Sequence, residues 1–261
     1  MTDHASVNDK YRSYLVPLAT LGMIAFNWLA AIGRINGVLP SDISDKYPTP
    51  VTPAGYAFSI WSLIHVGMIA FSIYQLTPAA TDRFRNLRSL YILTCALNCA
   101  WIYMWHSDQI AICFVLILLL AACLFLINLK LRETVGLREY WFAKAPFSVY
   151  FGWVTAATLV NFAVLLVHWN VSFSATAWMW LGIGLILLAA ALAVIVRIRL
   201  NNYLYPLAIA WALTGIGVKQ SGQTLIVVAT AVGTIAGLIA ALSFVVGLPS
   251  TDNPREPRAE Y

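Results

Sequence analysis

The sequence predicts an all-α fold, a polytopic membrane helix bundle with about eight transmembrane helices. Of the 261 residues, 61% are hydrophobic and 10% are charged, whereas soluble domains are roughly 45–50% apolar and about 25% charged. The apolar residues form repeated runs of roughly 20, the length that crosses a hydrocarbon core of about 30 Å as a helix. The runs lack the strict alternation of a membrane barrel strand, which argues against a β-barrel.

Eight apolar runs follow one another along the chain. Most of them are joined by short connections, which predicts that consecutive helices pack antiparallel. The seventh run is the shortest of those that we interpret as spans. In chain order the predicted spans are Tyr14–Gly33, Tyr56–Leu76, Leu90–Trp105, Ile110–Leu129, Pro146–Val167, Trp178–Val196, Tyr203–Val218 and Thr224–Gly247.

The spans divide the chain into four parts. We expect residues 1–13 to form a cytoplasmic amino terminus and residues 14–167 to form a five-helix membrane bundle. Residues 168–247 would add three further transmembrane helices. Residues 248–261 are polar and contain proline, which predicts a disordered cytoplasmic tail.

The distribution of basic residues predicts the orientation of the bundle. Of the 16 Lys and Arg residues, all but Arg34, Lys46 and Lys219 fall on the side of the two termini. Short loops rich in Lys and Arg remain in the cytoplasm, so both termini are expected there, and this polarity suits a bacterial inner membrane. The basic residues are scattered over several loops and form no dense stripe, which argues against a nucleic-acid partner.

One connection is much longer than the others. The segment from Arg34 to Pro53 contains four prolines, at positions 40, 48, 50 and 53. A long loop in an otherwise economical protein is usually functional or disordered, and prolines restrict the backbone. We therefore interpret residues 34–53 as a stiffened lid.

Ionisable side chains at membrane depth are candidates for function because they are costly to bury there. His65 lies near the middle of the second predicted span, and no acidic residue within any predicted span could pair with it. Three interpretations remain open. His65 could be a neutral imidazole bonded to a backbone carbonyl, hydroxyl or amide, a group that contacts a ligand or handles protons, or a ligand of haem iron.

Metal sites and catalytic motifs are not predicted. The four cysteines fall within the third and fourth spans, where free Cys behaves as a small hydrophobe. Cys95 and Cys99 are one helical turn apart, but no second pair of soft ligands follows at zinc spacing. The sequence contains no phosphate-cradling glycine loop, HExxH motif or nucleophile elbow, and no carboxylates paired for acid and base work.

Amide and indole groups suggest a pocket in the outer half of the bundle. Asn27, Asn98 and Asn161 fall inside predicted spans, and each amide needs partners for two donors and an acceptor. Three tryptophans are expected at a similar depth: Trp28, Trp61 and Trp101. These groups would gather beneath the lid, although amides that only join helices would show the same pattern.

The other tryptophans divide into two groups. Trp153 and Trp211 lie well inside spans, where an indole fills a large volume and seeks a partner for its N–H. They suit a cavity for a flat aromatic ligand, and packing alone would also explain them. The rest lie near span ends and are expected in the interfacial belt: Trp105, Trp141, Trp169, Trp178 and Trp180.

Three motifs resemble one family of membrane proteins. Residues 97–101 read LNCAW, similar to the LN-x-AW motif of the TspO/translocator family, the tryptophan-rich sensory proteins. Residues 150–161, YFGWVTAATLVN, resemble that family's last helix, with Val149 where the family has proline. Residues 53–65, PAGYAFSIWSLIH, resemble its second helix, one residue shorter before the tryptophan and with His65 in place of the usual Tyr.

The resemblance covers residues 14–167, so the chain looks like an extended member with three additional helices. It implies a pocket within the five-helix bundle, lidded by the first loop, that binds porphyrins and other flat apolar molecules, including sterols. Carried over by motif, Trp61, Asn98, Trp101, Trp153 and Asn161 would line this pocket. With the two residues indicated by depth alone, the predicted ligand-binding set is Trp28, Trp61, His65, Asn98, Trp101, Trp153 and Asn161.

The leading functional hypothesis is a membrane protein that binds a tetrapyrrole or another flat apolar ligand for sensing or transport. No cofactor is required, and porphyrin or haem would enter as a ligand. A secondary transporter for a neutral or lipophilic solute is the first alternative, and a membrane enzyme with His65 as acid or base is the second. Gly233 and Gly237 form a small-xxx-small step that permits close helix approach within the protomer or in a homodimer.

Overall fold

A computed structural model describes residues 7–78 and 80–243 of the chain, and this part is helical with no strand. The expected tail at 248–261 lies outside the described residues. In order, the elements are α1 (Val7–Ala31), α2 (Pro40–Lys46), η1 (Gly55–Ser59), α3 (Ile60–Tyr74), α4 (Arg85–His106), α5 (Ile110–Lys130), α6 (Gly136–Glu139), η2 (Tyr140–Lys144), α7 (Ala145–His168), α8 (Ala175–Leu200), α9 (Tyr205–Lys219) and α10 (Thr224–Leu242).

The predicted membrane bundle is confirmed. Seven helical segments among the described residues are long and apolar enough to cross a membrane. The remaining predicted span, the seventh, corresponds to α9, which has 15 residues and therefore rises only about 22 Å, short of a hydrocarbon core of about 30 Å. Small residues such as Ala208, Ala212 and Gly215 are buried on α9, which lets it pack closely among its neighbours.

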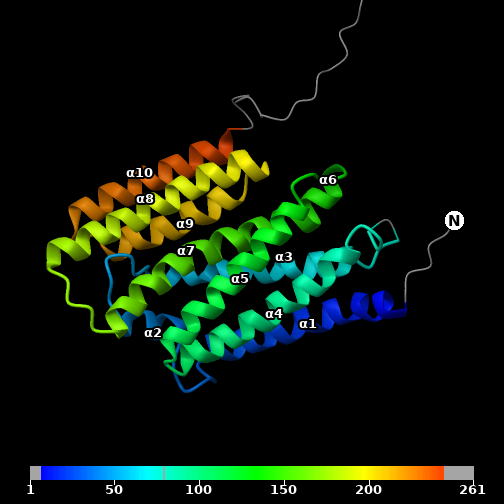
Figure 1. Cartoon of the computed structure of the whole chain (residues 1–261), viewed down its shortest axis with the longest axis horizontal. Coiled ribbons are helices and arrows are strands. Elements are labelled where there is room, and N and C mark those ends of the chain that lie inside the picture. The colour runs from blue at the N-terminus through cyan, green and yellow to red at the C-terminus, as the bar shows by residue number, and fades with distance from the viewer. Residues whose placement is uncertain (1–6, 79, 244–261) are drawn as a thin grey trace, which may run out of the picture.

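The helices form two groups joined through α7 and α9. Helices α1, α3, α4, α5 and α7 pack together, and α8, α9 and α10 pack as a second group against α7. Figure 1 shows α8, α9 and α10 side by side, with α10 ending at the end of the bundle where α1 begins. We call this end the basic end, and we call the opposite end, which carries the lid, the lid end.

Glycines allow close helix contacts both between the two groups and within the second group. A Cβ added at Gly152 of α7 would lie 2.6 Å from the carbonyl oxygen of Tyr205. On α10, a Cβ at Gly233 would meet Leu213 at 2.7 Å, and one at Gly237 would lie 3.1 Å from the Pro206 oxygen. The small-xxx-small step therefore packs α10 on α9 inside the protomer.

A buried ion pair ties the start of α1 to α4 at the basic end. Arg88 is fully buried, and its Nη1 donates to Oδ2 of Asp9 at 2.7 Å. The Nε of Arg88 donates to Oε1 of Gln75 at 2.9 Å, and its Nη2 donates to the Thr81 carbonyl at 2.7 Å. Because α1 begins at Val7, part of the expected amino-terminal segment is helix and contributes to this network.

Candidate functional site

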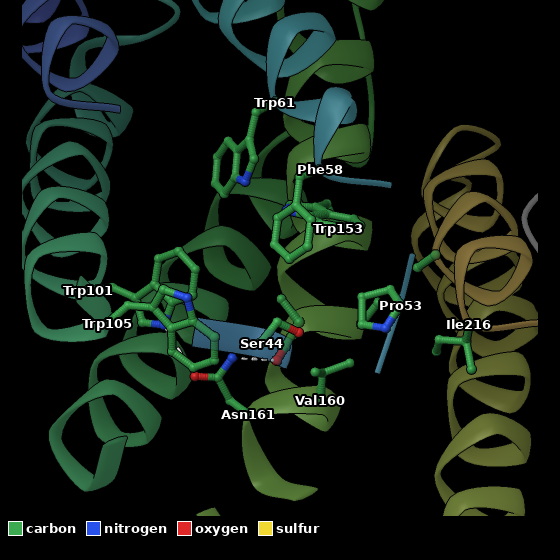
Figure 2. Close-up of a pocket in the computed structure, with 13 residues that line it drawn as sticks. Ser44, Pro53, Phe58, Trp61, Trp101, Trp105, Trp153, Val160, Asn161 and Ile216 are labelled. Atoms are coloured by element: carbon green, nitrogen blue, oxygen red, sulfur yellow. Dashed lines mark hydrogen bonds between the residues drawn. The ribbon is translucent and has the colours of Figure 1, made fainter. Parts of the chain in front are cut away.

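A small cavity lies under the lid at the junction of α4, α7 and α9 (Figure 2). Its volume is about 30 Å³, which is room for one or two waters, whereas ligand pockets usually measure about 300–1,000 Å³. The lining residues come from six helical elements and one loop, and none is charged: Ser44, Pro53, Phe58, Trp61, Trp101, Trp105, Trp153, Ala156, Ala157, Val160, Asn161, Ala212 and Ile216.

Tryptophans form much of the cavity wall. Trp101 and Trp105 lie one turn apart on α4, with ring centroids 5.8 Å apart and planes inclined by 22°. Trp153 of α7 meets Phe58 edge to face at 5.9 Å. The Trp101 indole N–H donates to Oδ1 of Asn161 at 3.3 Å, which orients its ring.

Several polar groups at the cavity are unused. The hydroxyl of Ser44 is buried without a hydrogen-bond partner in the described structure. Figure 2 shows the indole nitrogens of Trp61 and Trp153 directed toward the space between their rings. The wall can therefore stack on a flat apolar molecule and donate hydrogen bonds to its uncharged acceptors, but it supplies no cation for a carboxylate.

The lid is a folded segment that contains α2. On its α4 side, Trp105 Nε1 donates to the Pro40 carbonyl at 3.0 Å. The Tyr47 hydroxyl donates to Oδ1 of Asp108 at 2.8 Å and lies 3.2 Å from Nδ1 of His168. Lys46 forms a salt bridge with the same aspartate. These contacts close the lid over the cavity.

Helix α9 holds the other side of the lid. Lys219 Nζ donates to Oδ1 of Asp45 at 2.8 Å, and Gln220 Nε2 donates to the Thr49 carbonyl at 3.0 Å. The backbone N–H of Ala54 donates to the Gly215 carbonyl at 2.9 Å. The additional helices thus take part in building the site.

The Asp108 contacts make the lid sensitive to acid. Burial raises the pKa of Asp108, but hydrogen bonds from Lys46 and Tyr47 outweigh it, so the pKa lies below its usual 3.8. The hydrogen bond that Lys46 donates to Asp108 raises the pKa of Lys46. A carboxylate with a depressed pKa stabilises the fold above its unfolded pKa, and that contribution is lost as pH falls through its folded pKa.

We expect Asp108→Asn to loosen the lid, because the Lys46 ammonium loses its counter-charge. Amide hydrogen exchange of residues 40–47 should be several-fold faster than in the wild type above about pH 5. The difference should shrink only as the pH falls below the usual carboxyl value of 3.8 and through the lower folded pKa of Asp108, where protonation removes the charge from the wild type as well. Asp82→Asn, at an exposed carboxylate of the basic end, is the control. Equal exchange in all three proteins would contradict the lid contact.

The structure places the seven predicted ligand-binding residues in different environments. Trp61, Trp101, Trp153 and Asn161 line the cavity. Trp28 does not, because its side chain is 60% exposed on the outer face of α1.

Asn98 and His65 lie away from the cavity surface. Asn98 is fully buried and accepts a hydrogen bond from Asn27 Nδ2 at 2.6 Å, so these two amides join α4 to α1. His65 stacks on Trp61 with ring centroids 5.6 Å apart. In the described part of the chain, no three His, Cys, Asp or Glu residues gather in a way that could hold a metal ion.

Sequence reasoning missed other lining residues. The position of Trp105 near a span end predicts the interfacial belt, yet the residue is 2% exposed and lines the cavity. Its spacing of four from Trp101 was the available signal, because positions i and i+4 share a helix face. Ala212 and Ile216 of α9 had no such signal, since their role depends on how α9 docks.

Comparison with known proteins identifies the family. A family model of TSPO-like proteins matches residues 13–245, which includes α8, α9 and nearly all of the chain that the motifs left unassigned. No curated protein and no solved structure matches the chain significantly. The chain, an all-helical multi-pass membrane protein with a tryptophan-walled cavity under a folded lid, belongs to the TSPO-like protein family.

Proposed function

We propose that this protein binds a flat, apolar and uncharged small molecule beneath the lid and acts as a membrane binding or sensory protein. The observation that carries the proposal is the cavity wall of four tryptophans with no charged member: Trp61, Trp101, Trp105 and Trp153. The indole N–H groups of Trp101 and Trp105 already donate within the protein. With the basic end in the cytoplasm by the positive-inside rule, the lid would face the outside of a bacterial inner membrane.

Binding requires the cavity to enlarge. At about 30 Å³ the space is too small for a tetrapyrrole or a sterol, so the lid and the tryptophan side chains must move when ligand enters. A cleft of about 900 Å³ lies at the lid end, between lid residues 45–52 and the ends of α7, α8 and α9. Lid residues line both spaces, Ser44 and Pro53 the cavity and residues 45–52 the cleft, so movement of the lid would open the cavity from the lid end.

A tetrapyrrole is the demanding test of this proposal. Its ring suits the indole walls, whereas its carboxylates have no cation among the cavity residues, and burying an unpaired carboxylate is unfavourable. Protoporphyrin IX dimethyl ester should therefore bind more tightly than protoporphyrin IX, unless the carboxylates of the latter remain outside near Lys46 and Lys219.

The proposal is tested by titrating the detergent-purified protein with the dimethyl ester and following tryptophan quenching. Trp101→Ala should weaken binding at least about tenfold, because an aromatic pair contributes about 0.5–1.5 kcal/mol beyond its buried area. Trp28→Ala removes an indole outside the cavity and should leave affinity unchanged. Melting curves of both variants show whether the bundle persists. Equal affinity in folded Trp101→Ala and Trp28→Ala would contradict the proposal that this cavity is the ligand-binding site.

A further inference from the structure

Two cations are buried near each other at the basic end of the bundle. Lys144, in η2, is 4% exposed, and Arg197, in the last turn of α8, is 8% exposed. The positive charges of Arg197 and Arg132 both act on Lys144, and Arg132 itself is exposed, so the cluster extends to the surface. Burying a charge without a counter-charge is costly, so the source of negative charge here has to be identified.

The nearby acidic residues do not supply this counter-charge. Glu133 and Glu139 act on Lys144, but neither forms an ion pair with it in the described part of the chain. The Glu139 carboxylate instead accepts hydrogen bonds from Arg83 Nε at 2.9 Å and from the Val135 N–H at 3.0 Å. Glu133 is exposed to solvent. The two buried cations therefore lack a carboxylate partner among the described residues.

Both cations retain unused hydrogen-bond donors. Lys144 Nζ donates to the Arg132 carbonyl just beyond α5, which uses one of its three protons. The Arg197 guanidinium lies over the Tyr203 ring at 3.7 Å, its Nη1 is 3.5 Å from Asn201 Oδ1, and its Nε is buried with no hydrogen-bond partner in the described structure. The ends of α5 and α8 favour cations, but carbonyl dipoles neutralise only part of a full charge. An anion with several oxygens would satisfy the remaining donors.

An apolar groove of about 740 Å³ opens on the outer surface of the bundle in the same region. It is lined by α3, by η2 with the start of α7, and by the start of α9, and none of its lining residues is charged. Leu63 and Val66 on its α3 side are 61% and 64% exposed, so the groove faces lipid. Helices α7 and α9 both begin at the basic end (Figure 1). The groove therefore lies toward the cytoplasmic leaflet, by the positive-inside rule.

The groove and the cation cluster meet at two segments of the chain. Ala145 lines the groove, and the residue before it is Lys144. Leu204 also lines the groove, and the residue before it is Tyr203, whose ring lies against Arg197. A molecule with an anionic group at one end and an alkyl chain at the other would fit both features together.

We infer that an anionic phospholipid of the cytoplasmic leaflet binds at the basic end, with its phosphate at Lys144 and Arg197 and an acyl chain in the groove between α3 and α9. Basic pockets between transmembrane helices on the cytoplasmic side are typical sites for anionic headgroups. This site lies at the opposite end of the bundle from the lid. It goes beyond the proposed function and does not depend on it.

The test measures lipid binding to the detergent-purified full chain by native mass spectrometry. Dioleoyl phosphatidylglycerol and dioleoyl phosphatidylcholine have the same chains, so the ratio of their dissociation constants reports on the charge of the headgroup. We expect the wild type to bind phosphatidylglycerol about tenfold more tightly than phosphatidylcholine. Arg197→Gln and Lys144→Gln should each bring this ratio close to one. Phosphatidylglycerol should also raise the melting temperature of the wild type but not of these two variants.

Matched variants control for the loss of a surface charge and for added bulk. Arg199 lies on the same helix as Arg197 and is exposed, so Arg199→Gln should keep the wild-type ratio. Ala70 lines the groove, so Ala70→Phe should weaken binding of both lipids several-fold. Ala122→Phe adds the same bulk at an exposed position of α5 and should bind both lipids as the wild type does.

A soluble phosphate distinguishes a lipid from a free anion. Glycerol 3-phosphate carries the phosphate without acyl chains, and we expect it to compete for the site far more weakly than phosphatidylglycerol. Competition of equal strength would mean that the site takes a soluble anion, and would exclude the lipid.

Three other results would overturn the inference. Equal affinity of the wild type for the two lipids would exclude an anionic headgroup site. A preference for phosphatidylglycerol that persists in both Arg197→Gln and Lys144→Gln would place the phosphate elsewhere. Unchanged lipid binding by Ala70→Phe would remove the acyl chain from the groove. Each of these results leaves the cavity under the lid, and the function proposed for it, unaffected.

Discussion

Replacing Arg88 with methionine is expected to lower the free energy of unfolding by about 3–5 kcal/mol, the usual result of removing one member of a buried ion pair. The Asp9 carboxylate, which is 1% exposed, would lose the guanidinium that donates to it at 2.7 Å. Gln75 and the Thr81 carbonyl would lose their donor too. Unfolding in mixed micelles with increasing denaturing detergent measures the change.

Two further variants give this prediction its controls. Arg85 also pairs with Asp9, at 3.4 Å, but its side chain is 28% exposed, so Arg85→Met should change stability by less than about 1 kcal/mol. The double variant Asp9→Leu/Arg88→Met replaces both charges with apolar groups and should recover much of the loss. If Arg88→Met is no more harmful than Arg85→Met, the pair does not hold α1 to α4.

Gly152→Ala is expected to destabilise the protein by about 1–3 kcal/mol, because overpacking a close contact forces the backbone apart. The new methyl would lie 2.6 Å from the Tyr205 oxygen and 2.7 Å from Cβ of Ala208. The backbone at the start of α9 cannot yield as a flexible side chain would. Helix α9 should therefore shift away from α7, and amide exchange at lid residues 45–54 should rise as the α9 contacts weaken.

Gly22→Ala provides the matched comparison for this close contact. Gly22 also lies within a helix, but a Cβ there would meet nothing within 4 Å. Alanine is favoured over glycine inside a helix by roughly 0.5–1 kcal/mol, so Gly22→Ala should leave stability equal or higher. Thermal melting of Gly152→Ala and Gly22→Ala measures both effects, and similar melting temperatures would contradict the close contact between α7 and α9.

The helical spans and the family motifs could be predicted from the sequence. Membrane helices need long apolar runs because their backbone groups bond within the helix and their side chains face lipid. The residues Trp61, Trp101, Trp153 and Asn161 belonged to those motifs, and the structure brings all four to one cavity. The short helix α9 was less evident, because protein neighbours cover it and its apolar run does not need the full thickness of a bilayer.

The rotation of each helix could not be predicted in this way. In a soluble protein the apolar stripe shows which side faces the core, whereas a membrane helix is apolar toward lipid and toward protein alike. This is why the sequence could not distinguish Trp28 from Trp101, which it predicts at a similar depth. In the structure Trp28 is 60% exposed on the outside of the bundle, whereas Trp101 is 4% exposed in its interior. For the same reason, the sequence places Asn98 on its helix but does not predict that its side chain points toward Asn27.

The sequence by itself determined the class of protein, the approximate limits of its spans, the long lid and the family motifs, because each depends on residues close together in the chain. Only the tertiary structure decided that α9 clamps the lid, that Trp105 and Ala212 line the cavity, and that Asn98 pairs with Asn27 while His65 stacks on Trp61. Those relations join residues far apart in sequence, and they depend on close packing between helix faces that hydropathy does not distinguish.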